Sequence, residues 1–144
     1  MSKADVERKR QESNARNREA ADRYQKQANE IQEKHAKNQK QLERLREARS
    51  ALKKAMTTFA ELKKETKQYS TKISNGDFKG TLRDEFDEKA KKMGSSLQKE
   101  ENGLQENLAK LDTEIAKKEV EQGDLLGAIG SALDSARNFL ASIF

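Results

Sequence analysis

Several residue types that commonly stabilise small proteins are scarce in this chain of 144 residues. It contains no cysteine, no proline and no tryptophan, and it has one histidine. The lack of cysteine excludes disulfides, thiolate metal sites and a cysteine nucleophile. Leucine, isoleucine, valine and phenylalanine together contribute 25 residues, which is too few for a large globular core. An enzyme with a deep pocket is therefore not expected.

Histidine and acidic residues are present, but their spacing matches no known catalytic or metal-binding pattern. His35 lies in a segment rich in Lys, Glu and Gln, as an exposed helical residue would. The acidic pairs Asp84-Glu85 and Glu100-Glu101 are typical of solvated helix faces. No spacing typical of a metal site or of a glycine-rich phosphate loop occurs. We therefore expect a protein that is not an enzyme, with no catalytic residues, no metal and no cofactor.

Long apolar runs are missing too. No run of 18 apolar residues occurs, so no membrane-spanning helix is expected. Residues 1–20 contain basic side chains but no apolar segment, so the sequence predicts no secretory signal peptide.

Charged and helix-forming residues make up most of the chain. Ala, Glu, Lys, Leu and Arg account for 77 residues, a composition typical of long helices and coiled coils. The 30 basic and 25 acidic side chains leave a net charge of +5. Residues 1–40 hold 11 basic and 7 acidic side chains and are predicted to form a charged, solvated helical extension or a frayed tail. Because acidic residues are interspersed and no aromatic platform accompanies the basic ones, nucleic acid is not expected as a partner.

A seven-residue repeat begins near Tyr24 and predicts the first long helix. It consists of Tyr24, Ile31, Asn38, Leu45, Leu52, Phe59, Thr66 and Ile73. Neighbouring positions three or four residues away are filled by Leu42, Ala48, Ala55, Met56, Leu62 and Tyr69. This spacing places one apolar stripe along a helix. Asn38 lies on the stripe, where a polar residue can fix the register of a helix pair or mark where good packing begins.

A turn is predicted at 74–81, where Ser, Asn, Gly and Asp cluster. A second helix follows, with an apolar stripe formed by Leu82, Phe86, Ala90, Met93, Leu97, Leu104, Leu108, Leu111 and Ile115. Two stripes of similar length on either side of a short turn predict an antiparallel helical hairpin. The hairpin is expected to span 41–122.

The segment 123–144 has a different character, and Gly123-Asp124 is expected to end or kink the second helix. A third, strongly amphipathic helix is predicted there, with one apolar face. That face contains Leu125, Ile129, Ala132, Leu133, Ala136, Phe139, Leu140 and Ile143. The fold class is therefore all-α: an elongated, coiled-coil-like antiparallel hairpin with an N-terminal extension and a C-terminal amphipathic helix. Such a chain can form only a small hydrophobic core by itself, so we expect it to associate with a second copy or with a partner helix.

The residues around the turn resemble a known family. Phe78-Lys79-Gly80 and the following GTLRDEFD at 80–87 resemble the Trp-x-Gly turn of the WXG (early-secreted-antigen-like) superfamily. Phe78 stands for the family's tryptophan, Gly80 for its glycine and Phe86 for an aromatic that often follows. The likeness is greatest to a longer helical-hairpin subgroup encoded beside LXG toxins in Firmicutes, and it covers roughly residues 40–144. The Tyr-x-x-x-Asp/Glu export signal of the superfamily is absent after the second helix.

The resemblance implies a role in type VII secretion. Such proteins bind the helical N-terminal LXG domain of a toxin, often with a second small helical protein, and act as targeting factors or chaperones. The implied location is cytoplasmic before export, with secretion or cell-surface exposure alongside the cargo by a route without a signal peptide. A partner would then carry the export signal.

Two other interpretations stay open on the residues alone. One is a homo-oligomeric structural coiled coil. The other is a membrane-surface protein that uses its C-terminal amphipathic helix, although the Ser-rich polar face is poorly suited to anionic lipid. For partner and helix contacts, the residues predicted are Leu42, Leu45, Leu52, Phe59, Met93, Leu97, Leu104, Leu108, Leu111, Leu125, Ile129, Leu133, Phe139 and Leu140.

Overall fold

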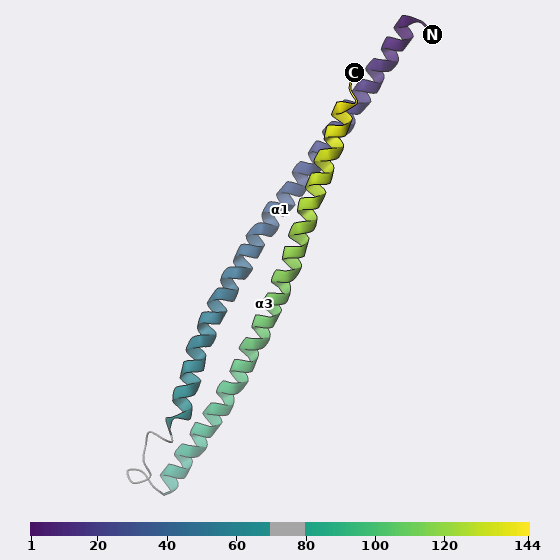
Figure 1. Ribbon diagram of the computed structural model, residues 1–144. Helices are drawn as coiled ribbons and strands as arrows, with labels where there is room; N and C mark the ends of the chain where they lie inside the picture. The colour runs from purple at the N-terminus through teal and green to yellow at the C-terminus, as the bar shows by residue number, and fades with distance from the viewer. Residues whose placement is uncertain (70–79) are drawn as a thin grey trace. The chain divides into compact units, whose positions relative to one another are not determined.

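The computed structural model describes residues 1–69 and 80–144, and it consists of two long helices in these residues (Figure 1). Helix α1 spans Lys3–Lys67 and helix α3 spans Thr81–Ala141. They pack against each other as an antiparallel pair, so the predicted all-α helical hairpin is confirmed. Phe78, Ile73 and most of the predicted turn lie outside the described residues.

Helix α1 begins at Lys3 because the residues around it form a capping box. The Asp5 backbone N–H donates to the Ser2 hydroxyl oxygen at 3.1 Å, and the Ser2 backbone N–H donates to the Asp5 carboxylate at 3.3 Å. The two side chains thus satisfy backbone donors that a helix N-terminus leaves without intrahelical acceptors. At the start of α3, Gly80 has a φ of 83°, which is the positive value that the predicted glycine turn requires.

The chain divides into two compact units, each with its own helix pair. Unit 1 consists of Met1–Glu43 and Ala116–Phe144, and unit 2 consists of Arg44–Ile115. Within unit 1, residues of the predicted charged N-terminal extension or frayed tail (1–40) pack against the C-terminal part of α3. Asn14 Nδ2 donates to the Phe144 carbonyl at 2.8 Å, and Asn17 Nδ2 donates to the Ser142 carbonyl at 3.1 Å. These amides satisfy backbone carbonyls just past the end of α3.

Helix α3 is continuous through Gly123, so a helix end there, one of the two outcomes expected, is wrong, and residues 123–141 form the last part of α3. A glycine inside a helix costs about 1 kcal/mol relative to alanine. That local cost is offset because the residues on both sides of Gly123 pack against α1: Asn38 contacts Lys118 and Gln122, while Ile129 is buried. The amphipathic C-terminal segment therefore buries its face within its own chain.

The contacts between the helices follow alternating steps of three and four residues, as in a coiled coil. In unit 1 the fully buried residues are mostly small. They are Ala20, Ala21, Ala28 and Leu42 on α1, and Ile129, Ala132 and Ala136 on α3, together with the polar Asn14 and Asn38. Many small contacts between these alanines therefore contribute to this pair, together with the larger Leu42 and Ile129.

In unit 2 the seam between the helices contains larger side chains, most of them half-buried. Its half-buried aliphatic and aromatic residues are Leu45, Leu52, Met56 and Phe59 on α1, and Leu97, Leu104, Leu108 and Leu111 on α3. Charged residues interrupt this series. Lys63 Nζ lies 3.0 Å from the Glu101 carboxylate, with side chains 15% and 22% exposed, and Arg49 pairs with Asp112.

Candidate interaction surfaces

Residues 1–69 and 80–144 contain no group of three or more His, Asp or Glu side chains that could hold a metal ion. His35 is half-buried in the seam of unit 1, and its backbone carbonyl accepts a hydrogen bond from Gln122 Nε2 at 3.3 Å. In the part of the chain that the structure describes, no helix is long and apolar enough to cross a membrane.

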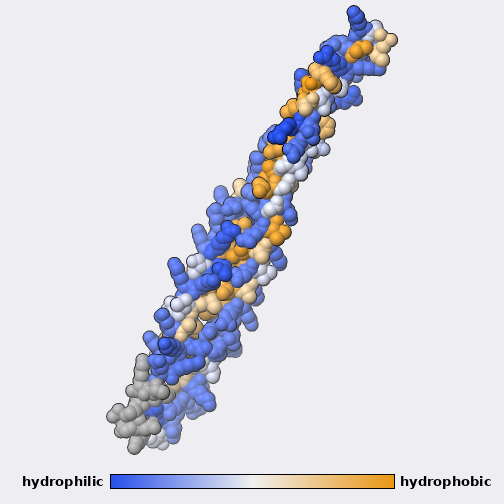
Figure 2. Space-filling view, viewed as in Figure 1, coloured by the Kyte–Doolittle hydropathy of each residue, from blue (hydrophilic) through white to orange (hydrophobic). Residues whose placement is uncertain are grey.

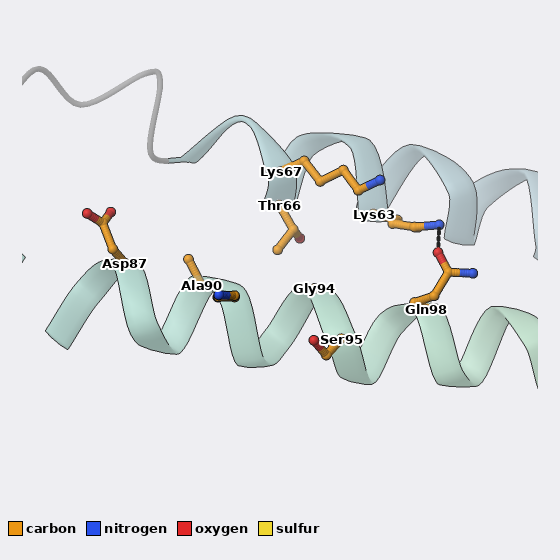
Figure 3. Close-up of a pocket in the computed structure, with 9 residues that line it drawn as sticks. Lys63, Thr66, Lys67, Asp87, Ala90, Gly94, Ser95 and Gln98 are labelled. Atoms are coloured by element: carbon orange, nitrogen blue, oxygen red, sulfur yellow. Dashed lines mark hydrogen bonds between the residues drawn. The ribbon is translucent and has the colours of Figure 1, made fainter. Parts of the chain in front are cut away.

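A pocket of about 380 Å³ lies between the helices of unit 2 (Figure 3). It forms because the facing seam residues Thr66, Ala90 and Gly94 are small. Lys63 lies beside it and donates to the Gln98 side-chain oxygen, as the dashed line in Figure 3 shows. Lys63 is also paired with Glu101, and Asp87, which lines the pocket together with Lys67 and Lys91, is paired with Arg83.

A polar layer crosses the seam of unit 1. Asn38 is 4% exposed, and its Nδ2 donates to the Lys118 carbonyl at 3.0 Å and to Gln122 Oε1 at 2.7 Å. Gln122 Nε2 in turn donates to Gln39 Oε1 at 2.9 Å. Asn38 therefore lies on the seam as predicted and is tied to one level of α3. Its Oδ1 has no hydrogen-bond partner among the described residues.

The structure brings most of the predicted contact residues into the seams. Leu42 and Ile129 are buried, and ten others are half-buried: Leu45, Leu52, Phe59, Leu97, Leu104, Leu108, Leu111, Leu125, Leu133 and Phe139. Two of the predicted residues are exposed instead, Met93 at 49% and Leu140 at 54%. Met93 lies outside the seam because the adjacent Gly94 occupies the seam position. Phe86 is half-buried, with the Arg83 guanidinium 5.8 Å from its ring centre.

Exposed apolar residues form a first surface in unit 2, which we name the turn-proximal patch. It consists of Leu62, Leu82, Phe86 and Met93. Leu82 is 65% exposed and Leu62 is 45% exposed. Steps of four and seven residues place Leu82, Phe86 and Met93 on one face of α3. Leu62 directly precedes the seam residue Lys63, and Met93 directly precedes the seam residue Gly94. In an antiparallel helix pair, residues that precede seam positions on the two helices lie on the same side of the pair.

A second surface lies on α3 in unit 1, and we name it the outer seam. It consists of Gly123, Leu126, Gly130, Leu133, Arg137 and Leu140. These residues follow the same steps of three and four as the inner seam, displaced by one residue from it. Leu126 is 60% exposed and Leu140 is 54% exposed. Figure 2 shows hydrophobic residues gathered along this part of the molecule. Packing of two helices against each other needs two apolar positions per seven residues. The outer seam adds a third apolar position, which the pairing with α1 does not need.

Comparisons with protein-family models, with curated protein sequences and with solved structures gave no match.

Proposed function

We propose that this chain is a non-enzymatic helical partner protein, which binds a helical segment of another protein through the turn-proximal patch. The single observation that carries the proposal is the exposure of Leu62, Leu82 and Met93 on one side of unit 2. Apolar side chains at steps of four and seven residues are the pattern by which one helix binds another. They remain exposed although each adjoins a seam position.

The resemblance of residues 78–87 to the WXG turn gives this partner a more specific form. The partner is then the helical N-terminal LXG domain of a toxin, with or without a second small helical protein. The chain acts as a targeting factor or chaperone that delivers the toxin for type VII secretion, from a cytoplasmic location before export. Gly80 with its positive φ supports the resemblance at the turn, and Phe86 supports it at the start of α3.

The test is a capture experiment followed by binding with purified components. The tagged chain is used to recover proteins from its host, and the helical N-terminal domain of any large protein recovered is then purified. We expect that domain to bind the natural chain and to lose at least tenfold in affinity for Leu82→Gln/Met93→Gln, because these exposed leucine and methionine side chains supply the apolar contact.

The matched control is Leu126→Gln, which removes an exposed leucine from the outer seam and leaves the patch intact. Both substitutions are at exposed positions, so the helix content measured by circular dichroism is expected to stay unchanged. Equal binding of the domain to both variants contradicts the proposal. Recovery of the chain alone would favour the homo-oligomeric coiled coil.

A further inference from the structure

The outer seam of α3 has a composition that the helix pair of unit 1 does not require. Gly123 and Gly130 are interior helix positions, where glycine is less favourable than alanine. A Cβ added at either position would meet no atom of the described residues within 4 Å. Packing within the chain therefore does not select glycine here. Leu126 and Leu140 are likewise more than half exposed.

Leucine and glycine alternate along this seam. The order is Gly123, Leu126, Gly130, Leu133, Arg137 and Leu140, with a leucine at each second position. Two such stripes fit each other when one runs antiparallel to the other with a two-fold axis between residues 130 and 133. Leu133 then lies on the partner's Gly130 and Leu140 lies on the partner's Gly123. Large side chains facing small ones give the interdigitated packing that close helix contacts need.

The third contact in this alignment is also favourable. Leu126 faces the partner's Arg137, whose aliphatic stem can cover a leucine while its charged end stays in water. In the structure Arg137 is 79% exposed and its guanidinium lies 3.7 Å from the Asp134 carboxylate of the same helix. The charge of Arg137 therefore has a local counter-charge and does not need one from the other chain.

Charge on this surface selects no other class of partner. Between Gly123 and Leu140 the charged residues are Asp124, Asp134 and Arg137, a net charge of −1. A basic rim that would hold anionic lipid is missing from these residues. A self-complementary stripe with so little net charge suits a symmetric interface between identical chains, in which the same patch meets itself.

We propose that the outer seam binds a second copy of this chain, as a symmetric antiparallel pair with Leu133 on the partner's Gly130 and Leu140 on the partner's Gly123. The pair brings two copies of unit 1 together as a bundle of four helices. This interface is separate from the turn-proximal patch, which belongs to unit 2, and the proposed partner binding does not depend on it.

The first test is the mass of the purified full chain by analytical ultracentrifugation over a range of concentrations. We expect a reversible shift from the 16.4 kDa chain to twice that mass. Leu126→Gln/Leu140→Gln is expected to raise the dissociation constant at least tenfold, since both leucines lose their apolar contact. Leu82→Gln/Met93→Gln is expected to dimerise like the natural chain, which separates this result from the proposed function. If the natural chain stays monomeric at all concentrations tested, the proposed dimer is wrong.

A second variant tests the alignment and not merely the apolar character. Gly130→Leu adds exposed apolar surface to a position with open space in the single chain. An unspecific apolar patch would associate more strongly after this change. The leucine-on-glycine alignment instead predicts at least tenfold weaker dimerisation, because the partner's Leu133 meets a leucine. Gly103→Leu is the control, since an added Cβ there also meets no described atom within 4 Å. Dimerisation of Gly130→Leu at natural strength overturns the alignment.

Cross-linking tests the direction of the two chains. The sequence has no cysteine, so a single introduced cysteine reports one site. At a rise of 1.5 Å per residue, the two copies of residue 133 are about 4.5 Å apart along the axis and those of residue 140 about 25 Å apart. A short bis-maleimide is therefore expected to link Leu133→Cys and not Leu140→Cys. A parallel pair would be linked at both positions, which would contradict the proposal.

Discussion

The ring of Tyr24 on α1 stacks on the ring of Phe139 on α3, with centroids 5.7 Å apart and planes inclined by 14°. Both residues are half-buried in a part of the seam that is otherwise lined by alanines. The two rings are therefore the largest apolar contact between α1 and α3 at that level of unit 1. They join residues 115 positions apart in the sequence, at segments that the sequence pattern predicts as separate parts.

The first prediction concerns this ring pair. Each of Tyr24→Ala and Phe139→Ala is expected to lower the free energy of unfolding by about 1–3 kcal/mol, below the range for fully buried aromatic residues. The double variant is expected to lose less than the sum, with a coupling of about 0.5–1.5 kcal/mol from the stacked rings. Urea unfolding of the natural chain, the two single variants and the double variant measures this coupling free energy. Tyr24→Phe keeps the ring and is expected to preserve the coupling, whereas purely additive losses would contradict the contact.

The second prediction concerns the polar layer. Asn38→Leu alone is expected to lower the free energy of unfolding by about 1 kcal/mol, because it leaves the Gln122 side chain without its Asn38 donor in a half-buried place. In Asn38→Leu/Gln122→Leu the polar pair is replaced by apolar groups, and the unpartnered Asn38 Oδ1 is removed as well. That double variant is expected to match or exceed the natural chain in thermal stability. A double variant weaker than Asn38→Leu would contradict this account.

The third prediction concerns the charged pair in unit 2. Lys63 and Glu101 lie in the seam, with side chains 15% and 22% exposed. Removing one partner, as in Glu101→Met, leaves the other charge in a poorly solvated place and is expected to cost about 1–3 kcal/mol. Replacing both by methionine is expected to recover that loss, since apolar side chains of similar volume suit the seam. Thermal unfolding of the single and double variants measures the effect, and a double variant as weak as the single one would contradict it.

The sequence predicts the hairpin because an apolar stripe repeats on both helices, and Leu42, Leu104 and Ile115 lie where that stripe places them. It does not predict which of two adjacent stripes forms the seam near the turn. Leu62 and Met93 look like seam residues, but Lys63 and Gly94 occupy those positions, and a charged residue or a glycine gives no signal of burial.

The continuity of α3 is a second feature that local sequence does not reveal. Gly123-Asp124 has the composition of a helix end, and a window of neighbouring residues contains nothing against that interpretation. Contact of Lys118 and Gln122 with Asn38 decides the outcome, and it joins residues 80 and 84 positions apart. The start of α1 is different, because its capping pair, Ser2 and Asp5, is local in sequence; the prediction of an extension or frayed tail over 1–40 overlooked it.

The last prediction tests that first turn. Ser2→Ala removes the hydroxyl that accepts from the Asp5 backbone N–H, and it leaves one donor at the helix start without a partner. The loss is expected to be about 0.5–2 kcal/mol, confined to the first turn of α1. Hydrogen exchange of the backbone amides measures it, with faster exchange expected at Asp5 and Val6 and no change near Leu42. Ser2→Asp supplies another acceptor at the same place and is expected to restore slow exchange, so equal exchange in the alanine and aspartate variants would contradict the capping role.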